Sequence, residues 1–185
     1  MKGVFLDRDG ILCNLVYRDN KLTSVRSVEE TYINQDVIDG CKKLKRNGFK
    51  LICVTNQPDI SRGFTTMAEQ IRICDKISWY CDLDAVEICP HDDKDGCDCR
   101  KPRAGMLKKH IHNYGLHGNA YMVGDTWRDH AAARSAGAYP LTIPNANTLT
   151  LKFGIGSKGA HFVGDFTHAV DTIINLDAKK PWRTK

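Results

Sequence analysis

The sequence lacks the features that would place the protein in a membrane or send it out of the cell. No apolar run approaches the roughly 20 residues that a membrane-spanning helix needs. The opening residues, MKGVFLDRDG, carry acidic side chains from Asp7 onward, which argues against a secretory signal peptide. We therefore predict a cytoplasmic protein with no membrane partner, in a compartment where disulfides are rare.

Cysteine is too sparse to build a disulfide scaffold, since the chain has eight cysteines in 185 residues. Three of them lie within CPHDDKDGCDCRKP, which runs from Cys89 to Pro102. The clustering of these three, rather than the total, needs an explanation. The other five are scattered, mostly in apolar segments where a free thiol packs as a small hydrophobic group: Cys13, Cys41, Cys53, Cys74 and Cys81.

Charge and pattern exclude two further classes of protein. The chain has 27 Lys and Arg against 22 Asp and Glu, and the basic residues form no stripe interleaved with aromatics, so we do not expect nucleic-acid binding. A Walker pattern is absent, which argues against nucleotide cradling of the P-loop type. Because there is no internal repeat, low-complexity tract or linker, we predict one domain over residues 1–178 with a tail over 179–185. We expect this domain to be monomeric.

Short apolar strands alternate with amphipathic helices along the chain. Such strands imply a parallel sheet covered on both faces, which is an α/β, Rossmann-like three-layer domain. The second helix begins with a capping-box pair, Thr66 and Glu69. No segment is long enough for a large cap domain, so we expect an open site closed only by loops such as residues 12–34. The predicted strands cover residues 3–6, 49–54, 85–89, 120–124 and 138–143, with a weak one over 161–164, and the predicted helices cover 36–48, 66–81, 105–115, 128–137 and 166–176.

Three of the predicted strands end abruptly in a polar residue, at Asp7, Thr55 and Asp125. In an open parallel sheet, ligands bind at the carboxyl ends of the strands, so the three endings predict one shared site. Any single one of these residues has an alternative role as a cap for the helix or turn that follows it.

The stretch DRDG adds a second carboxylate beside the first. In an extended chain Asp7 and Asp9 project to the same side, because side-chain direction repeats every two residues. An Asp is ionised at neutral pH, so Asp7 is suited to act as a nucleophile, while Asp9 is suited to hold or accept a proton. Asp7 and Asp125 would bring negative charges together, which favours a hard cation such as Mg²⁺.

Neutral and cationic side chains complete a set suited to phosphoryl transfer. Thr55 and Asn56 are donors at a strand end, Arg62 offers a fork for an anion, and Lys101 offers a point charge. Carboxylates, a cation, a hydroxyl and a lysine together stabilise a transferring phosphoryl group.

The cysteine cluster has the ligand types and spacing of a zinc site. Cys-x-His followed five residues later by Cys-x-Cys gives four ligands, Cys89, His91, Cys97 and Cys99, the number that a structural zinc takes. A disulfide is the alternative, and a calcium loop fails because its first position would be His91. A metal that closes residues 89–99 just before Arg100 would fix the direction of the cations that follow.

These motifs resemble the haloacid dehalogenase (HAD) superfamily of phosphohydrolases. DRDGI is similar to its first motif, VTN to its second, Lys101 to its third and GDTWRD to its fourth. The stretches VTNQ, ISRG and CDCRKP resemble the heptose bisphosphate phosphatase and histidinol-phosphatase group. The resemblance implies that Asp7 becomes an aspartyl-phosphate, Asp9 is the general acid and base, and Thr55 and Lys101 hold the phosphoryl group. It also implies Mg²⁺ ligands at Asp7, the backbone carbonyl of Asp9, and Asp125.

Our leading hypothesis is a Mg²⁺-dependent phosphomonoesterase that acts on a small sugar phosphate and takes the C7 phosphate from a heptose 1,7-bisphosphate. Lys101 and Mg²⁺ would serve the reacting phosphate, which leaves Arg62 and Arg100 without an assigned partner and suits them to the second phosphate. Asn56 would contribute to substrate binding. The alternatives are a histidinol-phosphate phosphatase, a nucleic-acid-end phosphatase and an inactive binding module.

Overall fold

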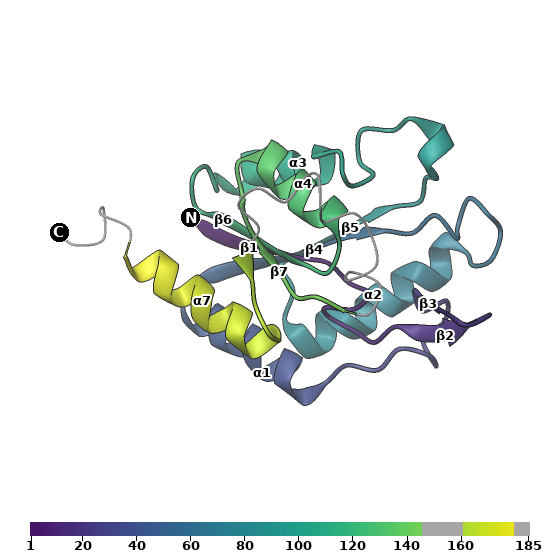
Figure 1. Cartoon of the computed structure of the whole chain (residues 1–185), viewed down its shortest axis with the longest axis horizontal. Coiled ribbons are helices and arrows are strands. Elements are labelled where there is room, and N and C mark those ends of the chain that lie inside the picture. Colours follow the sequence, from purple (N-terminus) through teal and green to yellow (C-terminus); the bar gives the residue numbers. More distant parts are fainter. Residues whose placement is uncertain (146–160, 180–185) are drawn as a thin grey trace.

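A six-stranded parallel sheet forms the centre of the molecule (Figure 1). The computed structural model describes residues 1–145 and 161–179. The strand order is β5-β4-β1-β6-β7-β8, so the chain builds one side of β1 before it crosses to the other. This order places a topological switch between β1 and β6. The strands are β1 (Lys2–Leu6), β4 (Phe49–Asn56), β5 (Ala85–Cys89), β6 (Ala120–Gly124), β7 (Tyr139–Thr142) and β8 (His161–Phe162).

Helices cover both faces of the sheet and bury a separate core on each (Figure 1). Alternate residues of β1 enter different cores, since Val4 and Leu6 pack on one face and Phe5 on the other. The prediction of an α/β, three-layer domain with a parallel sheet is therefore confirmed. On one face lie α1 (Gln35–Arg46), α2 (Met67–Cys81) and α7 (Phe166–Ala178), and on the other lie α3 (Gly105–Tyr114) and α4 (Trp127–Ala136).

The start of α2 differs from the predicted capping box. The Thr66 hydroxyl oxygen accepts a hydrogen bond from the backbone N–H of Glu69 at 3.1 Å, as expected for the first half of the box. The Glu69 carboxylate instead accepts from the backbone N–H of Val28 at 2.9 Å. The reciprocal half of the prediction is wrong, because this carboxylate ties the helix to the segment that follows β1.

That segment contains a hairpin where we expected only a loop. β2 (Val16–Arg18) and β3 (Lys21–Thr23) pair antiparallel, and the turn residues Asp19 and Asn20 have φ of 49° and 59°. Two successive residues in the left-handed region are typical of the tight turns that match strand twist. Among residues 1–145 and 161–179, no helix is both long and apolar enough to cross a membrane.

Candidate active site

A cavity of about 470 Å³ lies at the carboxyl ends of β1, β4 and β6. The predicted strand endings meet there, since Asp7, Thr55 and Asp125 all line it, together with Asp9 and Lys101. Asp7 and Asp125 follow β1 and β6, the strands on either side of the topological switch. This is the position at which open parallel sheets bind their ligands.

Three carboxylates crowd together in this cavity. One oxygen each from Asp7, Asp125 and Asp129 can lie within 4.8 Å of the others. Burial raises the pKa of Asp7 to about 6, and the charges of Asp129 and Asp9 add to the rise while Lys101 opposes it. Burial raises the pKa of Asp125 to about 8, with further contributions from the charges of Asp7 and Asp129. A cluster of oxygen donors that repel one another fits a hard divalent cation.

Lys101 supplies the positive charge against these carboxylates. Its side chain is 2% exposed, and its Nζ lies 2.7 Å from Asp7 Oδ1 and 2.6 Å from Asp129 Oδ1. Burial alone would lower the pKa of Lys101, but the two carboxylates outweigh that effect and raise it above its ordinary value. Lys101 therefore stays charged beside Asp7.

Asn56 positions Lys101 through the backbone. Its Oδ1 accepts from the backbone N–H of Lys101 at 3.0 Å, and its Nδ2 donates to the backbone carbonyl of Lys101 at 2.9 Å. Asn56 lines the cavity. Both polar atoms of the Asn56 side chain, which we expected to face the substrate, are thus hydrogen-bonded to the backbone of Lys101.

Gln57 links two of the predicted residues and was missed by the sequence analysis. Its Nε2 donates to Asp9 Oδ2 at 2.7 Å and to Thr55 Oγ1 at 2.7 Å. Gln57 is buried, as is Thr55. The Thr55 hydroxyl accepts from this amide, so its own hydrogen can donate to an anion in the cavity.

Two glycines permit the close approach of these side chains. Gly10 has φ of +87°, and a Cβ there would lie 2.7 Å from Asp125 Oδ2. A Cβ on Gly124 would lie 2.3 Å from the Cβ of Asp129. Any larger residue at either position would push a carboxylate out of the cluster.

The four predicted zinc ligands converge at the end of β5. Their sulfur atoms lie 3.2 to 3.7 Å apart, and His91 Nδ1 lies 3.3 Å from Cys99 Sγ and 3.7 Å from Cys89 Sγ. Ligands at zinc's usual bond lengths in a tetrahedron would be separated by about 3.5 to 3.8 Å. All eight cysteines are free thiols, and sulfurs at these separations are not in a disulfide. The cluster therefore fits a four-coordinate zinc.

Arg62 and Arg100 line the cavity, but each already contacts a carboxylate. Arg62 Nε lies 2.7 Å from Asp92 Oδ2, and Arg100 Nε lies 2.7 Å from Asp93 Oδ1. Arg100 Nη1 also donates to the backbone carbonyl of His91 at 3.2 Å. Both arginines, which we assigned to the second phosphate, therefore pair with carboxylates of the chain here, and their role in substrate binding stays a prediction. Asp92 and Asp93 are on the loop between β5 and α3, which also holds the predicted zinc ligands, and Arg62 has a second contact with Asp59 at 3.4 Å.

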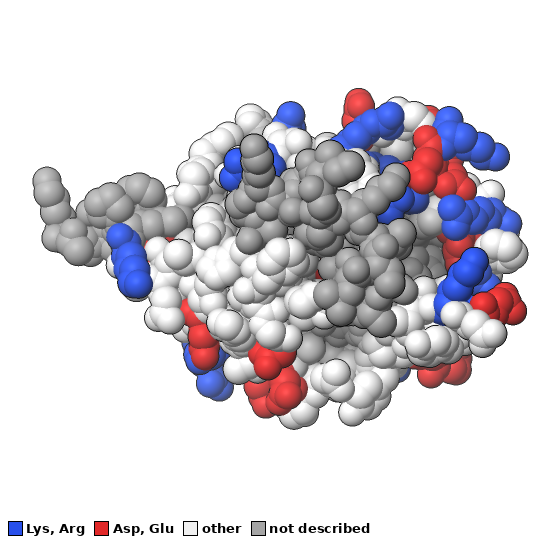
Figure 2. All heavy atoms as spheres, in the orientation of Figure 1, with Lys and Arg blue, Asp and Glu red and all other residues white. Residues whose placement is uncertain are grey.

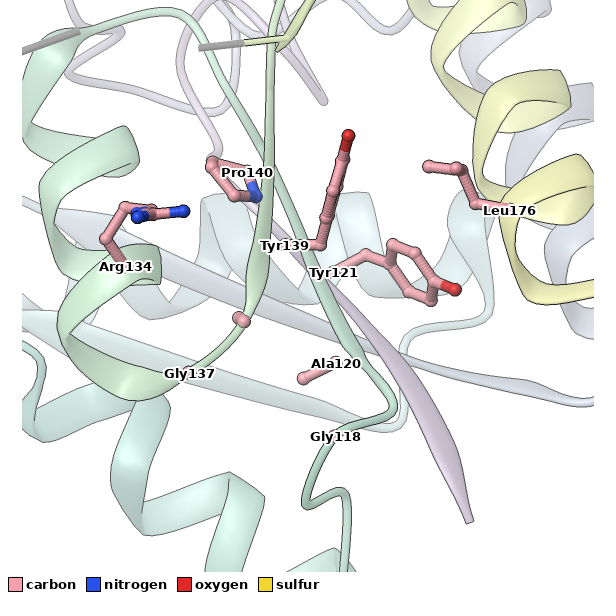
Figure 3. Close-up of a pocket in the computed structure, with 9 residues that line it drawn as sticks. Gly118, Ala120, Tyr121, Arg134, Gly137, Tyr139, Pro140 and Leu176 are labelled. Atoms are coloured by element: carbon pink, nitrogen blue, oxygen red, sulfur yellow. The ribbon is translucent and has the colours of Figure 1, made fainter. Parts of the chain in front are cut away.

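A second hollow, of about 480 Å³, lies at the amino ends of β6 and β7 (Figure 3). Among the described residues that line it, Arg134 is the one that carries a charge, and Tyr121, Tyr139 and Leu176 are part of its wall. No carboxylate is present in the part of this wall that the structure describes, in contrast to the first cavity at the carboxyl ends of the strands.

Fold and site together define the class of the protein, which is a HAD-like phosphatase. The HAD-hydrolase-like family model matches residues 98–167. The D,D-heptose 1,7-bisphosphate phosphatase from B. bronchiseptica, solved with magnesium and phosphate, is 29% identical, has a TM-score of 0.81, and is matched over 95% of this chain and 99% of its own.

Curated relatives narrow this class to one family. The D-glycero-beta-D-manno-heptose-1,7-bisphosphate 7-phosphatase of Escherichia coli K12 is 36% identical, with 99% of this chain and 93% of the relative covered. The enzyme of that name from Haemophilus influenzae is 34% identical over 69% of this chain and 73% of the relative. The chain belongs to the family of the D-glycero-beta-D-manno-heptose-1,7-bisphosphate 7-phosphatases.

Proposed function

We propose that the protein removes the C7 phosphate from D-glycero-beta-D-manno-heptose 1,7-bisphosphate with the help of Mg²⁺. The observation that carries this proposal is the placement of Asp7 in the cavity, with Lys101 Nζ at 2.7 Å and two further carboxylates beside it. A carboxylate held by a fixed cation at a site for a divalent metal is suited to attack phosphorus. The names and the magnesium and phosphate complex of the relatives support the choice of substrate and metal.

The proposed reaction has two displacements at phosphorus. Asp7 forms a bond to phosphorus while the bond to the sugar oxygen breaks, and Asp9 gives that oxygen its proton. Water then forms a bond to phosphorus while the bond to Asp7 breaks, and Asp9 takes the proton from the water. Thr55 and Lys101 donate to the phosphoryl oxygens in both steps.

The proposed Mg²⁺ ligands are Asp7, the backbone carbonyl of Asp9, and Asp125, with Asp129 close enough to join them. When bound, the ion neutralises the charge that builds on the phosphoryl oxygens. We also propose a structural zinc on Cys89, His91, Cys97 and Cys99. The further parts of the proposal are a monomer in the cytoplasm, one domain over residues 1–178, and a tail over 179–185.

Magnesium should stabilise the protein more at about pH 9 than at about pH 6. The pKa of Asp125 is about 8 in the metal-free fold and 3.8 as its ordinary value, so the folded state holds this proton more tightly than the unfolded chain. The free energy of unfolding without metal should therefore fall as the pH rises through this interval. Mg²⁺ must displace the proton at low pH and relieves the repulsion at high pH.

Melting temperatures with and without Mg²⁺ at both pH values test this expectation. Asp125→Asn should remove the pH dependence of stability that Asp125 contributes. It should also remove most of the stabilisation by Mg²⁺. An equal stabilisation by Mg²⁺ at the two pH values would contradict the assignment of Asp125 as a ligand.

The arginines at the cavity support a substrate with two phosphates. A second phosphate can replace Asp92 and Asp93 as the partner of Arg62 and Arg100, since an Arg fork binds a phosphate as readily as a carboxylate. Histidinol phosphate carries a cationic amine, and the carboxylates that would receive it, Asp59, Asp92 and Asp93, all contact arginines. Histidinol phosphate therefore has less support as the substrate than a sugar bisphosphate.

The charge distribution argues against a nucleic-acid-end phosphatase. Figure 2 shows Lys and Arg interleaved with Asp and Glu at the end of the molecule that holds β2 and β3. Non-specific binding to nucleic acid needs a run of cations along the phosphate backbone. On this face the cations are matched by carboxylates.

The substrate is tested by comparing kcat/KM for the heptose bisphosphate, a sugar monophosphate and histidinol phosphate in the presence of Mg²⁺. We expect the bisphosphate to be preferred, and Arg100→Ala should reduce that preference by about tenfold or more, because a charge-assisted contact is lost. Hydrolysis of an aryl phosphate should change less. Arg72→Ala, at an exposed arginine of α2 that pairs with Glu69, is the matched control.

Arg100 also contacts His91 and Asp93, within the residues 89–99 that hold the proposed zinc ligands. Zinc content is therefore measured in the Arg100→Ala variant. Equal losses on the mono- and bisphosphate with zinc retained would show that Arg100 serves the reacting phosphate instead.

A further inference from the structure

Arg8 carries a positive charge inside the protein. It is 0% exposed and does not line the cavity. An arginine keeps its charge under all ordinary conditions, and a buried charge is costly unless it is paired and hydrogen-bonded. A fully buried arginine between the nucleophile and the general acid therefore requires a specific role.

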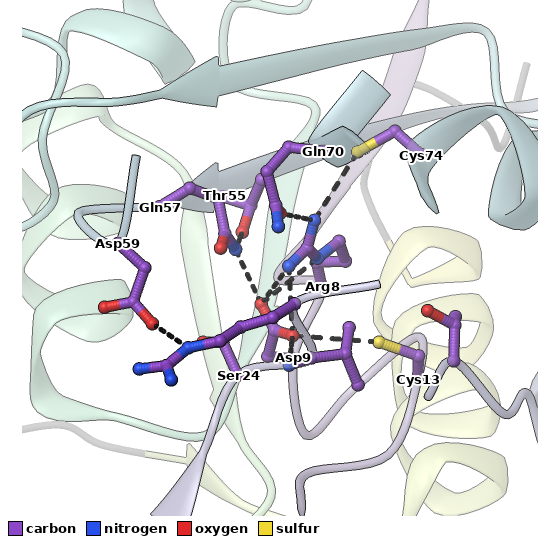
Figure 4. Close-up of polar contacts among 12 residues, drawn as sticks. Arg8, Asp9, Cys13, Ser24, Thr55, Gln57, Asp59, Gln70 and Cys74 are labelled. Atoms are coloured by element: carbon purple, nitrogen blue, oxygen red, sulfur yellow. Dashed lines mark hydrogen bonds and ion pairs between the residues drawn. The ribbon is translucent and has the colours of Figure 1, made fainter. Parts of the chain in front are cut away.

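The guanidinium of Arg8 donates hydrogen bonds to both carboxylate oxygens of Asp9 (Figure 4). Arg8 Nε donates to Asp9 Oδ2 at 3.1 Å, and Nη2 donates to Asp9 Oδ1 at 3.2 Å. The opposite corner of the guanidinium is held by α2, since Nη1 donates to Gln70 Oε1 at 2.6 Å. Gln70 is itself 0% exposed, and its Nε2 donates to Thr65 Oγ1 at 3.2 Å. The guanidinium that binds Asp9 is thus held in place by buried side chains of α2.

Asp9 remains able to reach the cavity while it is held in this way. It is 7% exposed and lines the cavity. Its other contacts are Gln57 Nε2 at 2.7 Å, the backbone N–H of Val25 at 3.2 Å and the thiol of Cys13 at 3.9 Å. Two parallel bonds from a planar fork fix both the place and the plane of a carboxylate, which neither Gln57 nor Val25 can do alone.

We propose that Arg8 is a positioning residue that aims the Asp9 carboxylate at the reacting oxygen, so that both proton transfers, but not the attack of Asp7, depend on it. The inference rests on the role given to Asp9 under Proposed function. Proton transfer requires a donor and an acceptor in hydrogen-bond geometry, and a displacement of about 1 Å can cost on the order of 100-fold in rate. Asp7 keeps its own contact with Lys101 and does not touch the fork.

Rapid mixing with 4-nitrophenyl phosphate separates the two steps. Its leaving group needs no proton, so the initial burst reports the attack of Asp7 and the steady state reports the hydrolysis that needs Asp9 as a base. Arg8→Met should change the burst rate by no more than about threefold and slow the steady state by about 100-fold. Phospho-enzyme should then accumulate and be visible by intact mass. Lys2→Met breaks a partly buried pair with Asp177 far from the cavity, and it should lower stability without changing the ratio of burst rate to steady-state rate.

A double variant tests whether Arg8 acts through Asp9. Arg8→Met combined with Asp9→Asn should match Asp9→Asn alone within about twofold in the steady state, because the fork has nothing left to aim. This pair loses both charges together, so it should fold even where Arg8→Met does not. Arg8→Lys keeps the charge without the fork and should remain impaired by about tenfold.

The outcomes distinguish the role proposed for Arg8 from the role proposed for Asp9. Multiplicative losses in the double variant, or a burst slowed as much as the steady state, would show a general structural role for Arg8 and overturn the inference alone. Full turnover by Asp9→Asn would overturn the role of Asp9 and the inference with it.

Discussion

Asp7→Asn is expected to lower turnover by at least about 10⁴-fold while the protein stays folded. An amide has nearly the volume of a carboxylate but cannot attack phosphorus. Lys101 keeps two partners in this variant, Asp129 Oδ1 at 2.6 Å and the backbone carbonyl of Val54 at 2.8 Å. The expected loss of turnover therefore comes from the missing nucleophile and not from a displaced Lys101.

The stability of the variant gives an independent readout. Burial raises the pKa of Asp7 to about 6, so ionised Asp7 is disfavoured in the metal-free fold. At about pH 8 the amide removes that unfavourable charge, and the metal-free variant should unfold at a temperature no lower than the wild type. Asp171→Asn, which breaks an exposed pair with Lys43, is the control for loss of an acidic residue elsewhere.

Steady-state assays with Mg²⁺ and intact-mass measurements after mixing with substrate decide the outcome. Asp7→Asn should form no phospho-enzyme. More than a trace of turnover by a folded Asp7→Asn protein would exclude the covalent mechanism.

The layered fold could be predicted because its elements are buried in a regular way. Strands covered on both faces become continuous apolar runs, and helices that cover them repeat apolar residues at helical spacing. The glycines at the ends of α3 and α4, Gly115 and Gly137, have φ of 60° and 74°, the left-handed conformation in which helices commonly end.

The hairpin β2–β3 could not be predicted in the same way. Each strand has three residues and is only partly buried, so it has no apolar run. Its turn uses Asp19 and Asn20 rather than the Asn-Gly or Asp-Gly pair that marks such turns most clearly.

The expectation that ligands bind at the carboxyl ends of parallel strands predicted the position of the cavity but not all of the residues in it. Asp129 follows Thr126 at a spacing typical of a helix cap, and it does cap α4, since its Oδ2 accepts from the backbone N–H of Thr126 at 3.0 Å. Its other oxygen contacts Lys101. In the sequence Arg8 has the pattern of a solvated residue between two acids, and only its contacts with Gln70 and Cys74 of α2 show where it is buried. Such roles depend on contacts between residues far apart in the chain, which local pattern does not encode.

Loss of one of the proposed zinc ligands should have the second large effect, on both stability and activity. Cys99 Sγ lies within 3.3 Å of Cys89 Sγ, Cys97 Sγ and His91 Nδ1, so it is central to the cluster. Apparent binding energies of structural zinc reach about 10 kcal/mol or more, and that energy stabilises the folded loop. Cys99→Ser should therefore lose zinc and unfold at a markedly lower temperature. Elemental analysis of the wild type should find about one zinc per chain, retained when Mg²⁺ is dialysed away.

Activity should fall with the metal because the loop leads directly into Lys101. Arg100 donates to the backbone carbonyl of His91, so a disordered loop would release Arg100 and loosen the residue after it. Asn56 still holds the backbone of Lys101, so we expect a loss of about 100-fold, smaller than that of Asp7→Asn. Cys81→Ala, at a buried thiol outside the cluster, should keep both zinc and activity. A zinc-free wild type, or a zinc-free Cys99→Ser variant with full activity, would show that Asn56 alone positions the cation and that the cysteines serve another purpose.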